Sequence, residues 1–542
     1  MSEPNDLQSL GLSDLPDHEI GSALLANILC ALDTADQKVR LSEILSNVQR
    51  LELANHLAPL DVLPPLLRCD DPAAGGLLRL IGEKANSKEV VMAAQEAVEL
   101  LEARYDSEEV DEQQTSSAAK QLVALLDLNS SSIPRLQLRK KTASETIGPL
   151  LGEQLRVILL YGDSFRPVEG RNVLSSANTL VHNVAGWIGG LGISDEESGK
   201  CKVILRDFLD SLITAFCDSI QSSIAQRTFE AAFPRLVVRS AVSPDWKHGE
   251  EIVAQLRDSY RLLGAVPAPA AQQLSIPSLI LMAHSDTKGN GSSSLVKFNP
   301  LVISCVQQNI ALDEALSVIL AAAHAAVTDP SSSDLPIEVI IPLCTVLPPL
   351  ASVHPDPPTR HLVFKTLSLI LRGSPAQLRL QVLCDLTSTE SAPQMRVAAI
   401  GLVREAIMEG IATPPSIFAS PKTMQVFGRT LFSPDPPDFF ARRALGEYRE
   451  SQEPARLVEC LTLYYLLLLR DEDNLTGIRD PSMVKDVEKS LLSPIRAAIK
   501  GDSGQASHTH EPHDMTIITL EIGLQRVDSA LETLNLSISR TN

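Results

Sequence analysis

Aromatic residues are scarce in this sequence, at 4% of its 542 positions. β-Sandwiches and barrels rely on aromatic and β-branched side chains, so this scarcity disfavours both architectures. Hydrophobic residues still make up 44% of the chain, and the core must therefore be built mainly from Leu, Ala, Val and Ile. This mixture favours helices that pack closely through small side chains.

Closely spaced cysteine pairs are also missing. The sequence has eight cysteines, none of them in a Cys-x-x-Cys pair: Cys30, Cys69, Cys201, Cys217, Cys305, Cys344, Cys384 and Cys460. Most of them lie in apolar helical segments. We therefore expect them to be small buried hydrophobic residues in a reducing compartment.

Positive charge is in short supply, with 47 Lys and Arg against 67 Asp and Glu and a net charge of −20. Phosphate backbones and anionic lipids repel such a chain, which disfavours nucleic-acid and membrane binding and favours protein partners. The N-terminus, MSEPNDLQSL, has no apolar stretch of a secretory signal. The longest apolar run, Leu461 to Leu469, is half of the ~18 residues that a membrane span needs. We expect a soluble protein of the cytoplasm or nucleus.

An internal repeat predicts the architecture. The segments PDPPTRHLVFKTLSLILRG and SAPQMRVAAIGLVREAIMEGI superpose with an offset of 36 residues, which places Pro357 on Pro393 and Arg360 on Arg396. Each begins with Pro in the first helical turn, where the missing N–H costs nothing, and continues with apolar residues at three- and four-residue steps. A period of about 20–50 residues indicates stacked helical units. We predict an all-α fold, a HEAT/armadillo-like α-solenoid of stacked antiparallel helix pairs.

Changes in composition divide this helical array. We expect N-terminal helical repeats at 1–128, a middle helical region with loops at 129–275 and C-terminal HEAT-like repeats at 276–500. A polar linker at 501–514 then leads to a C-terminal amphipathic helix at 515–542. The apolar face of that helix either caps the solenoid or is offered to a partner.

Three motifs resemble known sites but lack their context. Residues 501–504 (GDSG) match the tetrapeptide around the nucleophile of trypsin-like proteases, which needs a β-barrel and a separately placed His and Asp. The His-rich tract 508–513 can bind zinc or copper opportunistically, but it has no rigid framework. The glycines of 186–194 (GWIGGLGIS) lack the spacing of a phosphate-binding loop. We therefore expect no catalysis, no cofactor and no functional metal site.

Other polar groups leave alternatives open. The one compact basic cluster consists of Arg135, Arg139, Lys140 and Lys141. It is either a nuclear-localisation or phosphate-binding segment or a solvated, internally paired face. The acidic tract Asp106 to Ser117 is either a solvated loop or a docking strip for a basic partner. His284 and His324 lie on apolar helices, where we expect satisfied core histidines.

The strongest candidates for partner binding lie on the C-terminal helices. Charged residues flank strongly apolar segments there: Arg442, Arg443, Arg456, Arg470, Arg479 and Asp480. One interpretation is that they cap helices and form salt bridges between repeats. The other is that they form a ridge that binds a protein, since Arg is favoured in interface ion pairs.

Six motifs between about 279 and 499 support a family assignment: LDEALSVIL, HPDPPTRHLVFKTLSLIL, PQMRVAAIGLVREAI, LFSPDPPDFF, EPARLVECLTLYYLLLLRD and NLTGIRD. With them the region resembles the fungal members of the glomulin/YAP-binding-protein family. The resemblance implies a HEAT-like helical array without enzymatic activity. Animal members of that family bind the RING subunit of cullin ubiquitin ligases and block access of the E2. Yeast members assist oxidation of a stress-response transcription factor or associate with kinetochores.

The resemblance therefore implies a monomeric, non-catalytic adaptor that regulates a protein partner. That partner would be a RING-type ligase subunit or a stress-response transcription factor. An alternative is an assembly chaperone that resembles the helical-repeat chaperones of the proteasome base. An enzyme comes third, and would require a deep polar pocket with convergent ionisable groups.

Overall fold

The computed structural model describes residues 16–33, 37–107, 112–237, 239–264, 274–285, 292–328, 335–442, 451–505 and 515–534. Helices and connecting turns account for these residues, and no β-strand occurs among them. In this part of the chain, no helix is both long enough and apolar enough to cross a bilayer. The prediction of an all-α, solenoid-like fold is confirmed.

The chain divides into two compact units. The first comprises residues 1–227, 239–287 and 308–315, and the second comprises 228–238, 288–307 and 316–542. Three helices contribute residues to both: α11 (Ile224–Ala232), α14 (Ser292–Gln308) and α15 (Leu312–Thr328).

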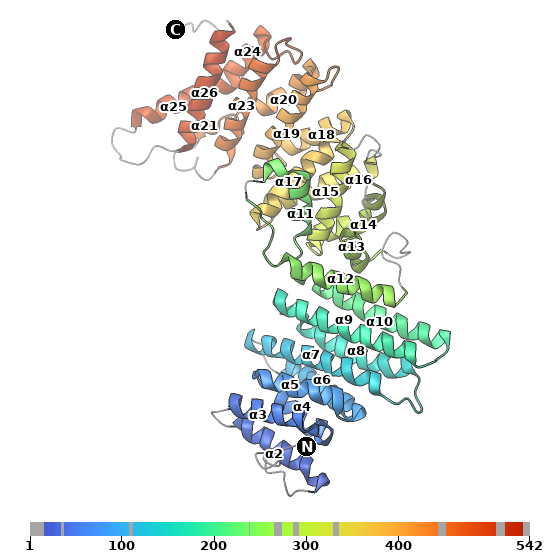
Figure 1. Cartoon of the computed structure of the whole chain (residues 1–542). Helices are drawn as coiled ribbons and strands as arrows, with labels where there is room; N and C mark the ends of the chain where they lie inside the picture. The colour runs from blue at the N-terminus through green and yellow to red at the C-terminus, as the bar shows by residue number, and fades with distance from the viewer. Residues whose placement is uncertain are drawn as a thin grey trace. The chain divides into compact units, whose positions relative to one another are not determined.

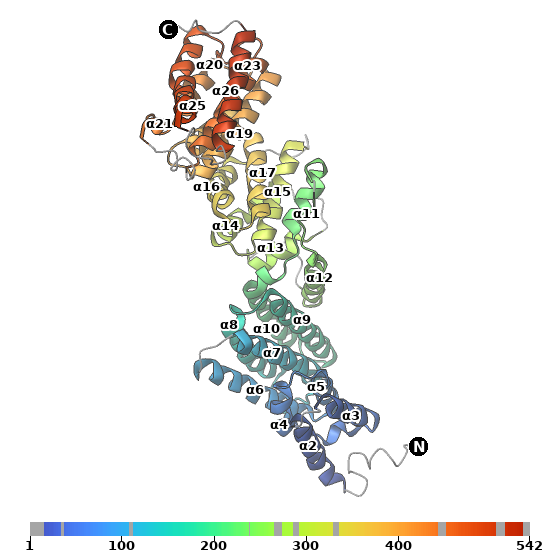
Figure 2. The same ribbon diagram turned by 90° about the vertical axis from the view of Figure 1, so that its left-hand side faces the viewer.

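The first unit is built from two rows of helices. One row contains α2 (Asp17–Asp33), α4 (Pro59–Leu67), α6 (Ser87–Ser107), α8 (Ala143–Gly162), α10 (Asp195–Phe216) and α13 (Ile276–Ala283). The other contains α3 (Gln37–Arg50), α5 (Pro72–Lys84), α7 (Glu112–Ser132), α9 (Pro167–Gly190) and α12 (Trp246–Leu262). Within each row, every helix packs on the one before it (Figures 1 and 2). This is the arrangement expected of helices that cannot bury their apolar stripes alone.

The second unit contains the repeated segments and the C-terminus. Its helices are α16 (Ile337–Val353), α17 (Pro357–Arg372), α18 (Ala376–Thr387), α19 (Pro393–Ala412), α20 (Pro421–Leu431), α21 (Phe439–Arg442), α23 (Glu453–Arg470), α24 (Pro481–Val487), α25 (Ser493–Gln505) and α26 (Met515–Thr533). Helix α16 packs on α17 and α19, α19 packs on α18 and α23, and α23 packs on α26.

Both copies of the internal repeat form helices that begin where the sequence predicted. Pro357 and Pro393 begin α17 and α19, as their first-turn positions predicted. The Asp356 carboxylate before α17 accepts a hydrogen bond of 3.0 Å from the Thr359 N–H, which caps that helix. The apolar stripes of both copies are buried, including the equivalent residues Leu367 and Val403.

The C-terminal helix resolves one of the alternatives left by the sequence. The apolar face of α26, with Leu520, Leu524, Val527 and Leu531, is buried in the same core as α23. A Cβ at Gly523 would lie 3.2 Å from the Leu461 side chain, so the two helices approach closely there. That face therefore covers the end of the stack. Residues 535–542 of the expected helix lie outside the described residues.

The expected linker at 501–514 is partly helical. Helix α25 continues to Gln505 through Gly501 and Gly504, because a glycine lowers helix stability by only about 1 kcal/mol and does not by itself end a helix. Residues 501–504 (GDSG) therefore lie on α25. The remaining positions, including the His-rich tract 508–513, lie outside the described residues.

Candidate protein-binding site

Arg456, one of the predicted binding residues, lies inside the second unit with 2% of its surface exposed. Its Nε and Nη2 donate to the Glu453 carboxylate at 2.7 and 2.6 Å. Its Nη1 donates to the Thr430 carbonyl at 2.8 Å, and its Nη2 also donates to the Ser433 carbonyl at 2.6 Å. These bonds fasten the beginning of α23 to the end of α20 and to the residues that follow it.

The hydrogen-bonding partners of Arg456 stabilise its positive charge. Burial alone would lower the pKa of the guanidinium, but its hydrogen bonds to Glu453 and the negative charges around it raise that pKa. Removal of either partner would leave a buried charge uncompensated, which is strongly destabilising. The Arg456–Glu453 pair is therefore a structural element of the second unit.

A second ion pair lies beside the first. Arg396, in the first turn of α19, donates from Nη2 to the Asp435 carboxylate at 2.7 Å. The Asp435 N–H donates to Glu453 Oε1 at 2.8 Å, which joins the two pairs into one network. The Nε of Arg396 is buried and has no hydrogen-bond partner among the described residues.

These residues line a cleft of about 450 Å³, which we call the α19–α23 cleft: Pro393, Gln394, Arg396, Asp435, Ser451, Gln452, Glu453 and Arg456. The beginnings of α19 and α23 both contribute to it. Of its lining residues, Pro393, Gln394 and Gln452 are exposed at the surface. Three motifs of the family resemblance supply the network, since Arg396 lies in PQMRVAAIGLVREAI, Asp435 in LFSPDPPDFF, and the Arg456–Glu453 pair in EPARLVECL.

The dense charges between α23 and α24 organise the connecting loop. Asp471, which is 1% exposed, accepts hydrogen bonds from the Leu475 N–H at 2.7 Å, the Thr476 N–H at 2.8 Å and the Thr476 hydroxyl at 2.6 Å. The buried Asp471 carboxylate thus accepts hydrogen bonds from three donor groups of the loop. The sequence did not single out this residue, because its neighbours carry the same kinds of charge.

The other predicted residues of this loop divide between internal and exposed roles. Arg479 donates from Nη2 to the Leu468 carbonyl at 2.6 Å, which caps the C-terminal end of α23. Asp480 is exposed and accepts a hydrogen bond of 2.8 Å from the Asn474 side chain. Arg470 is also exposed. The hydrogen bond from Arg479 to the Leu468 carbonyl agrees with the helix-capping interpretation.

The six predicted residues do not form a single described cluster. Arg442 ends α21, and its side chain lies outside the described residues, as does all of Arg443. Arg456 lies in the α19–α23 cleft, while Arg470, Arg479 and Asp480 belong to the loop after α23. Their role in partner binding stays a prediction.

A buried charge cluster in the first unit was not predicted. The His284 side chain, at the end of α13, is fully buried, and its Nδ1 lies 3.0 Å from Glu250 Oε1. Its Nε2 lies 3.4 Å from Glu314 Oε1. Glu250 also forms an ion pair with Arg227, whose guanidinium stacks 4.0 Å from the Trp246 ring.

Both members of the closer pair titrate far from their ordinary ranges. Burial alone would lower the pKa of His284, but hydrogen bonds to Glu250 and Glu314 and their charges raise it to about 9. Burial would raise the pKa of Glu250, but His284 and Arg227 lower it to about 2. His284 is therefore an imidazolium between two carboxylates at neutral pH. The prediction of a satisfied core histidine is confirmed, although its partners lie too far away in sequence to be read from a motif.

His324 differs from that expectation. It is only partly buried, and its ring contacts Phe233 edge-on with centroids 5.3 Å apart. Its neighbours Ala322 and Ala323 are buried, so His324 lies beside the buried face of α15 and not within it.

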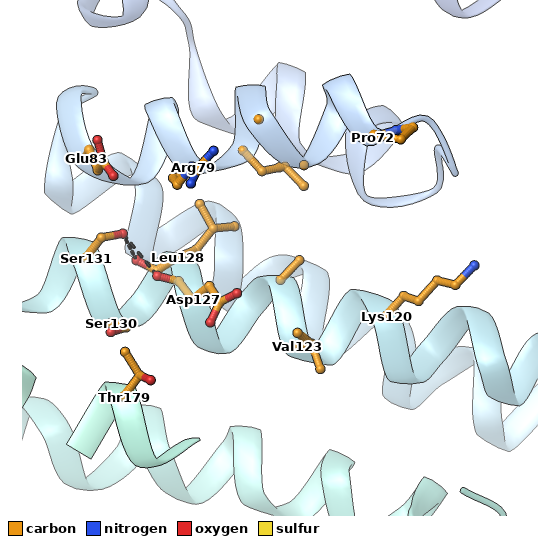
Figure 3. Close-up of a pocket in the computed structure, with 14 residues that line it drawn as sticks. Pro72, Arg79, Glu83, Lys120, Val123, Asp127, Leu128, Ser130, Ser131 and Thr179 are labelled. Atoms are coloured by element: carbon orange, nitrogen blue, oxygen red, sulfur yellow. Dashed lines mark hydrogen bonds between the residues drawn. The ribbon is translucent and has the colours of Figure 1, made fainter. Parts of the chain in front are cut away.

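A groove of about 550 Å³ runs along α5, α7 and α9 in the first unit. Figure 3 shows Arg79 and Glu83 on α5, and Lys120 and Asp127 on α7, spread along its length. Burial raises the pKa of the Asp127 carboxyl, although a hydrogen bond with Ser176 opposes that shift. The charges are of both signs and do not converge on one point, so the groove lacks the geometry of a catalytic site.

Burial suppresses the ionisation of several cysteine thiols. Burial raises the pKa of Cys201 to about 11, and that of Cys217, Cys344 and Cys460 to about 12, so these thiols stay protonated at neutral pH. Cys201, Cys217, Cys305 and Cys460 are buried as expected, whereas Cys30 is exposed and the other three, Cys69, Cys344 and Cys384, are only partly buried. Within the described part of the chain, no three His, Cys, Asp or Glu side chains are placed to hold a metal ion.

A search of curated proteins found no match to the chain. Residues 274–535 match the model of a protein family described as "Uncharacterised protein family, YAP/Alf4/glomulin". The match includes the helices from α16 to α26 and the whole α19–α23 cleft. Over residues 274–535, the chain is therefore similar to the YAP/Alf4/glomulin family, which supports the resemblance that its motifs indicated.

Proposed function

We propose that this protein is a non-catalytic adaptor that binds and regulates another protein through the helices of its second unit. The family match over residues 274–535 is the observation that carries the proposal. The partner we propose is the RING-type subunit of a cullin ubiquitin ligase or a stress-response transcription factor. The protein would act as a monomer in the cytoplasm or nucleus.

The α19–α23 cleft is the surface that we propose for this binding. Its two ion pairs fix the positions of α19, α23 and the residues after α20, so a partner meets a pre-organised surface. The exposed amides of Gln394 and Gln452 can donate and accept hydrogen bonds at its edge. Such a polar edge around fixed charges is suited to a regulatory, reversible interface.

The six charged residues of the C-terminal helices divide into two roles in this proposal. Arg456 and Arg479 position the backbone, because their guanidinium groups donate to internal acceptors. Arg470 and Asp480 are exposed and would contact the partner directly. We keep Arg442 and Arg443 as partner contacts on the basis of the sequence.

A ubiquitin-transfer assay tests the ligase version. The purified full-length protein is added to a reconstituted cullin–RING ligase with its E2, and ubiquitin-chain formation is measured over time. We expect inhibition that increases with protein concentration, together with direct binding to the RING subunit. Absence of both effects would remove this version.

A redox assay tests the transcription-factor version. Cells that lack this protein are exposed to peroxide, and the oxidised fraction of the stress-response factor is measured on non-reducing gels. We expect less oxidised factor than in wild-type cells and recovery when the protein is restored. Equal oxidation in both cell lines would remove this version, and failure of both assays would refute the proposed function.

A further inference from the structure

The predicted basic cluster separates into two parts in the structure. Arg135 points inward and donates from Nη1 to the Ala85 carbonyl at 2.8 Å, near the end of α5. Arg139, Lys140 and Lys141 are all exposed on the loop that precedes α8. Three consecutive exposed cations are unusual on a chain of net charge −20. The loop is therefore a local feature that a negatively charged protein surface can recognise.

A hydroxyl group follows these cations directly. Thr142 is exposed and is the N-cap of α8, where its Oγ1 accepts a hydrogen bond of 3.3 Å from the Glu145 N–H. In the segment Arg139-Lys140-Lys141-Thr142, the arginine stands three residues before the hydroxyl. Charge patterns of this type are what kinases with acidic substrate grooves select.

The surrounding structure distinguishes Thr142 from other residues with the same spacing. An arginine also precedes Ser107, Ser482 and Ser529 by three residues, but Ser107 ends α6, Ser482 belongs to the first turn of α24 and Ser529 lies inside α26. A kinase binds the residues before its acceptor hydroxyl in an extended form, and before Thr142 these residues are not helical. Thr142 follows a non-helical loop and has three adjacent cations.

We propose that Thr142 is a phosphorylation site for an ATP-dependent serine/threonine kinase that recognises basic residues. In this step the Thr142 Oγ1 attacks the γ-phosphorus of ATP and forms a new P–O bond. The bond from that phosphorus to the β,γ-bridging oxygen breaks, and ADP leaves with the electron pair. The hydroxyl proton passes to the base of the kinase.

The phosphate would change contacts between two helices of the first unit. Glu197, in the first turn of α10, accepts a hydrogen bond of 2.8 Å from the Ser144 N–H through its Oε1. This bond lowers the pKa of Glu197, which is therefore charged at neutral pH. A phosphate carries about −1.5 to −2 charges and is favoured at a helix N-terminus. It would pair with Arg139 and its neighbours and repel the carboxylates of Glu145 and Glu197.

The proposal predicts a specific local consequence. Glu197 should leave the beginning of α8, and the first turn of α10 should lose its tie to that helix. Phosphorylation would thus remove a contact between the N-terminal ends of α8 and α10 and leave the packing of their buried apolar faces unchanged.

In vitro phosphorylation tests the site. The full-length protein is incubated with ATP and the catalytic subunit of a cyclic-AMP-dependent kinase, and modified residues are located by peptide mass spectrometry. The same mapping is applied to protein isolated from its own cells. We expect phosphate on Thr142 in both samples. A phosphate confined to other residues, or absent from Thr142 in both samples, would overturn the proposal.

Variants separate recognition from folding. Arg139→Gln should lower the phosphorylation rate at least about tenfold, since a hydrogen bond to a charged group contributes enough for that factor. Thr142→Ser should keep both the cap and the phosphorylation, whereas Thr142→Val should lose the phosphate. Lys88→Gln, at an exposed residue elsewhere in the first unit, is the control. A wild-type rate for Arg139→Gln would contradict recognition of the basic loop.

Hydrogen exchange tests the consequence. The phosphorylated and unmodified proteins are compared by mass spectrometry. We expect faster exchange at residues 195–200 of α10 after phosphorylation, and no change in α7, which does not contain any residue of the proposed contact. Unchanged exchange at 195–200 would show that Glu197 is not released.

Discussion

His284 offers the sharpest prediction on stability, because a buried imidazolium between two carboxylates makes the first unit sensitive to pH. Its folded-state pKa is about 9, against an ordinary value of 6.5. The stabilisation is therefore fully present below pH 6.5 and is lost as the pH rises from 6.5 through about 9. A shift of this size corresponds to about 3 kcal/mol, since each pKa unit is worth about 1.4 kcal/mol.

The acidic side of the cluster behaves in the opposite way. The pKa of Glu250 falls to about 2, so its contribution is present above its ordinary pKa of 4.5 and is lost as the pH falls towards 2. The pKa shifts of Glu250 and His284 both report the ion pair between these two residues, so the stabilisation from one is not added to that from the other. Burial and the adjacent Glu314 raise the pKa of Asp313 to about 6, which opposes the effect of Glu250 in the acidic range. The range from pH 6.5 to 9 therefore isolates His284 within the cluster.

Tryptophan fluorescence provides a selective assay. Both tryptophans of the chain, Trp187 and Trp246, belong to the first unit, so their emission during urea unfolding reports on that unit. We expect the wild-type free energy of unfolding to fall by about 3 kcal/mol between pH 6.5 and 9. His284→Gln should be less stable at pH 6.5 by a similar amount and should lose most of this pH dependence.

A matched control is available on α12. His248 is exposed and lies two residues from Glu250, so His248→Gln should keep the wild-type pH dependence. If His284→Gln and the wild-type protein lost the same stability between pH 6.5 and 9, the reasoning on the buried imidazolium would be refuted.

Three further predictions concern the second unit. Arg456→Leu should destabilise it by about 3–5 kcal/mol because Glu453 stays buried without a partner, whereas Arg456→Leu combined with Glu453→Leu should recover most of the loss. Thermal unfolding measures the stability of the single and the double variant, and Arg470→Leu is the control at an exposed residue. Equal losses of stability in the single and double variants would contradict the pairing of Arg456 with Glu453. Asp471→Ala should cost about 2 kcal/mol locally by leaving the Leu475 and Thr476 N–H groups without their acceptor, which faster hydrogen exchange at 472–480 would reveal. Gly523→Leu should separate α26 from α23, because even a Cβ there would lie 3.2 Å from Leu461. Limited proteolysis should then cleave α26 faster than in Ile522→Ala, which alters an exposed neighbour, and equal rates would argue against close packing.

The fold was predictable from the sequence because its signal is local and periodic. First-turn prolines fix where α17 and α19 begin, and apolar residues at three- and four-residue steps mark the buried stripes. These features depend only on residues within one or two helical turns. The offset of 36 residues then indicates that the helices stack on one another.

The polar networks were not predictable in the same way. His284 contacts Glu250 and Glu314, which are 34 and 30 residues away in the sequence. Arg396 contacts Asp435, which is 39 residues away. Such pairings depend on how helices pack, which one-dimensional spacing does not specify. Arg456 illustrates the consequence, since its position beside an apolar segment fits both an exposed ridge and a buried ion pair.

The contacts of the loop after α23 were partly predictable from the sequence. Helix capping and partner binding were both open for Arg479 and Asp480, and a charged residue just beyond a helix fits either role. The contact of Arg479 with the Leu468 carbonyl shows that capping accounts for its orientation. The exposed Arg470 and Asp480 keep the binding interpretation as a proposal.

The central claim, that the second unit binds a protein partner through the α19–α23 cleft, is tested most directly by calorimetric titration. The full-length protein is titrated separately with a purified RING subunit and with the stress-response transcription factor. Gln452→Trp places a bulky side chain at an exposed position that lines the cleft, whereas Ala455→Trp alters an exposed position of α23 outside it. We predict that one partner binds, that Gln452→Trp weakens binding at least about tenfold and that Ala455→Trp does not. Binding of neither partner would contradict the proposed function, and equal weakening by both variants, or by neither, would contradict the cleft as its site.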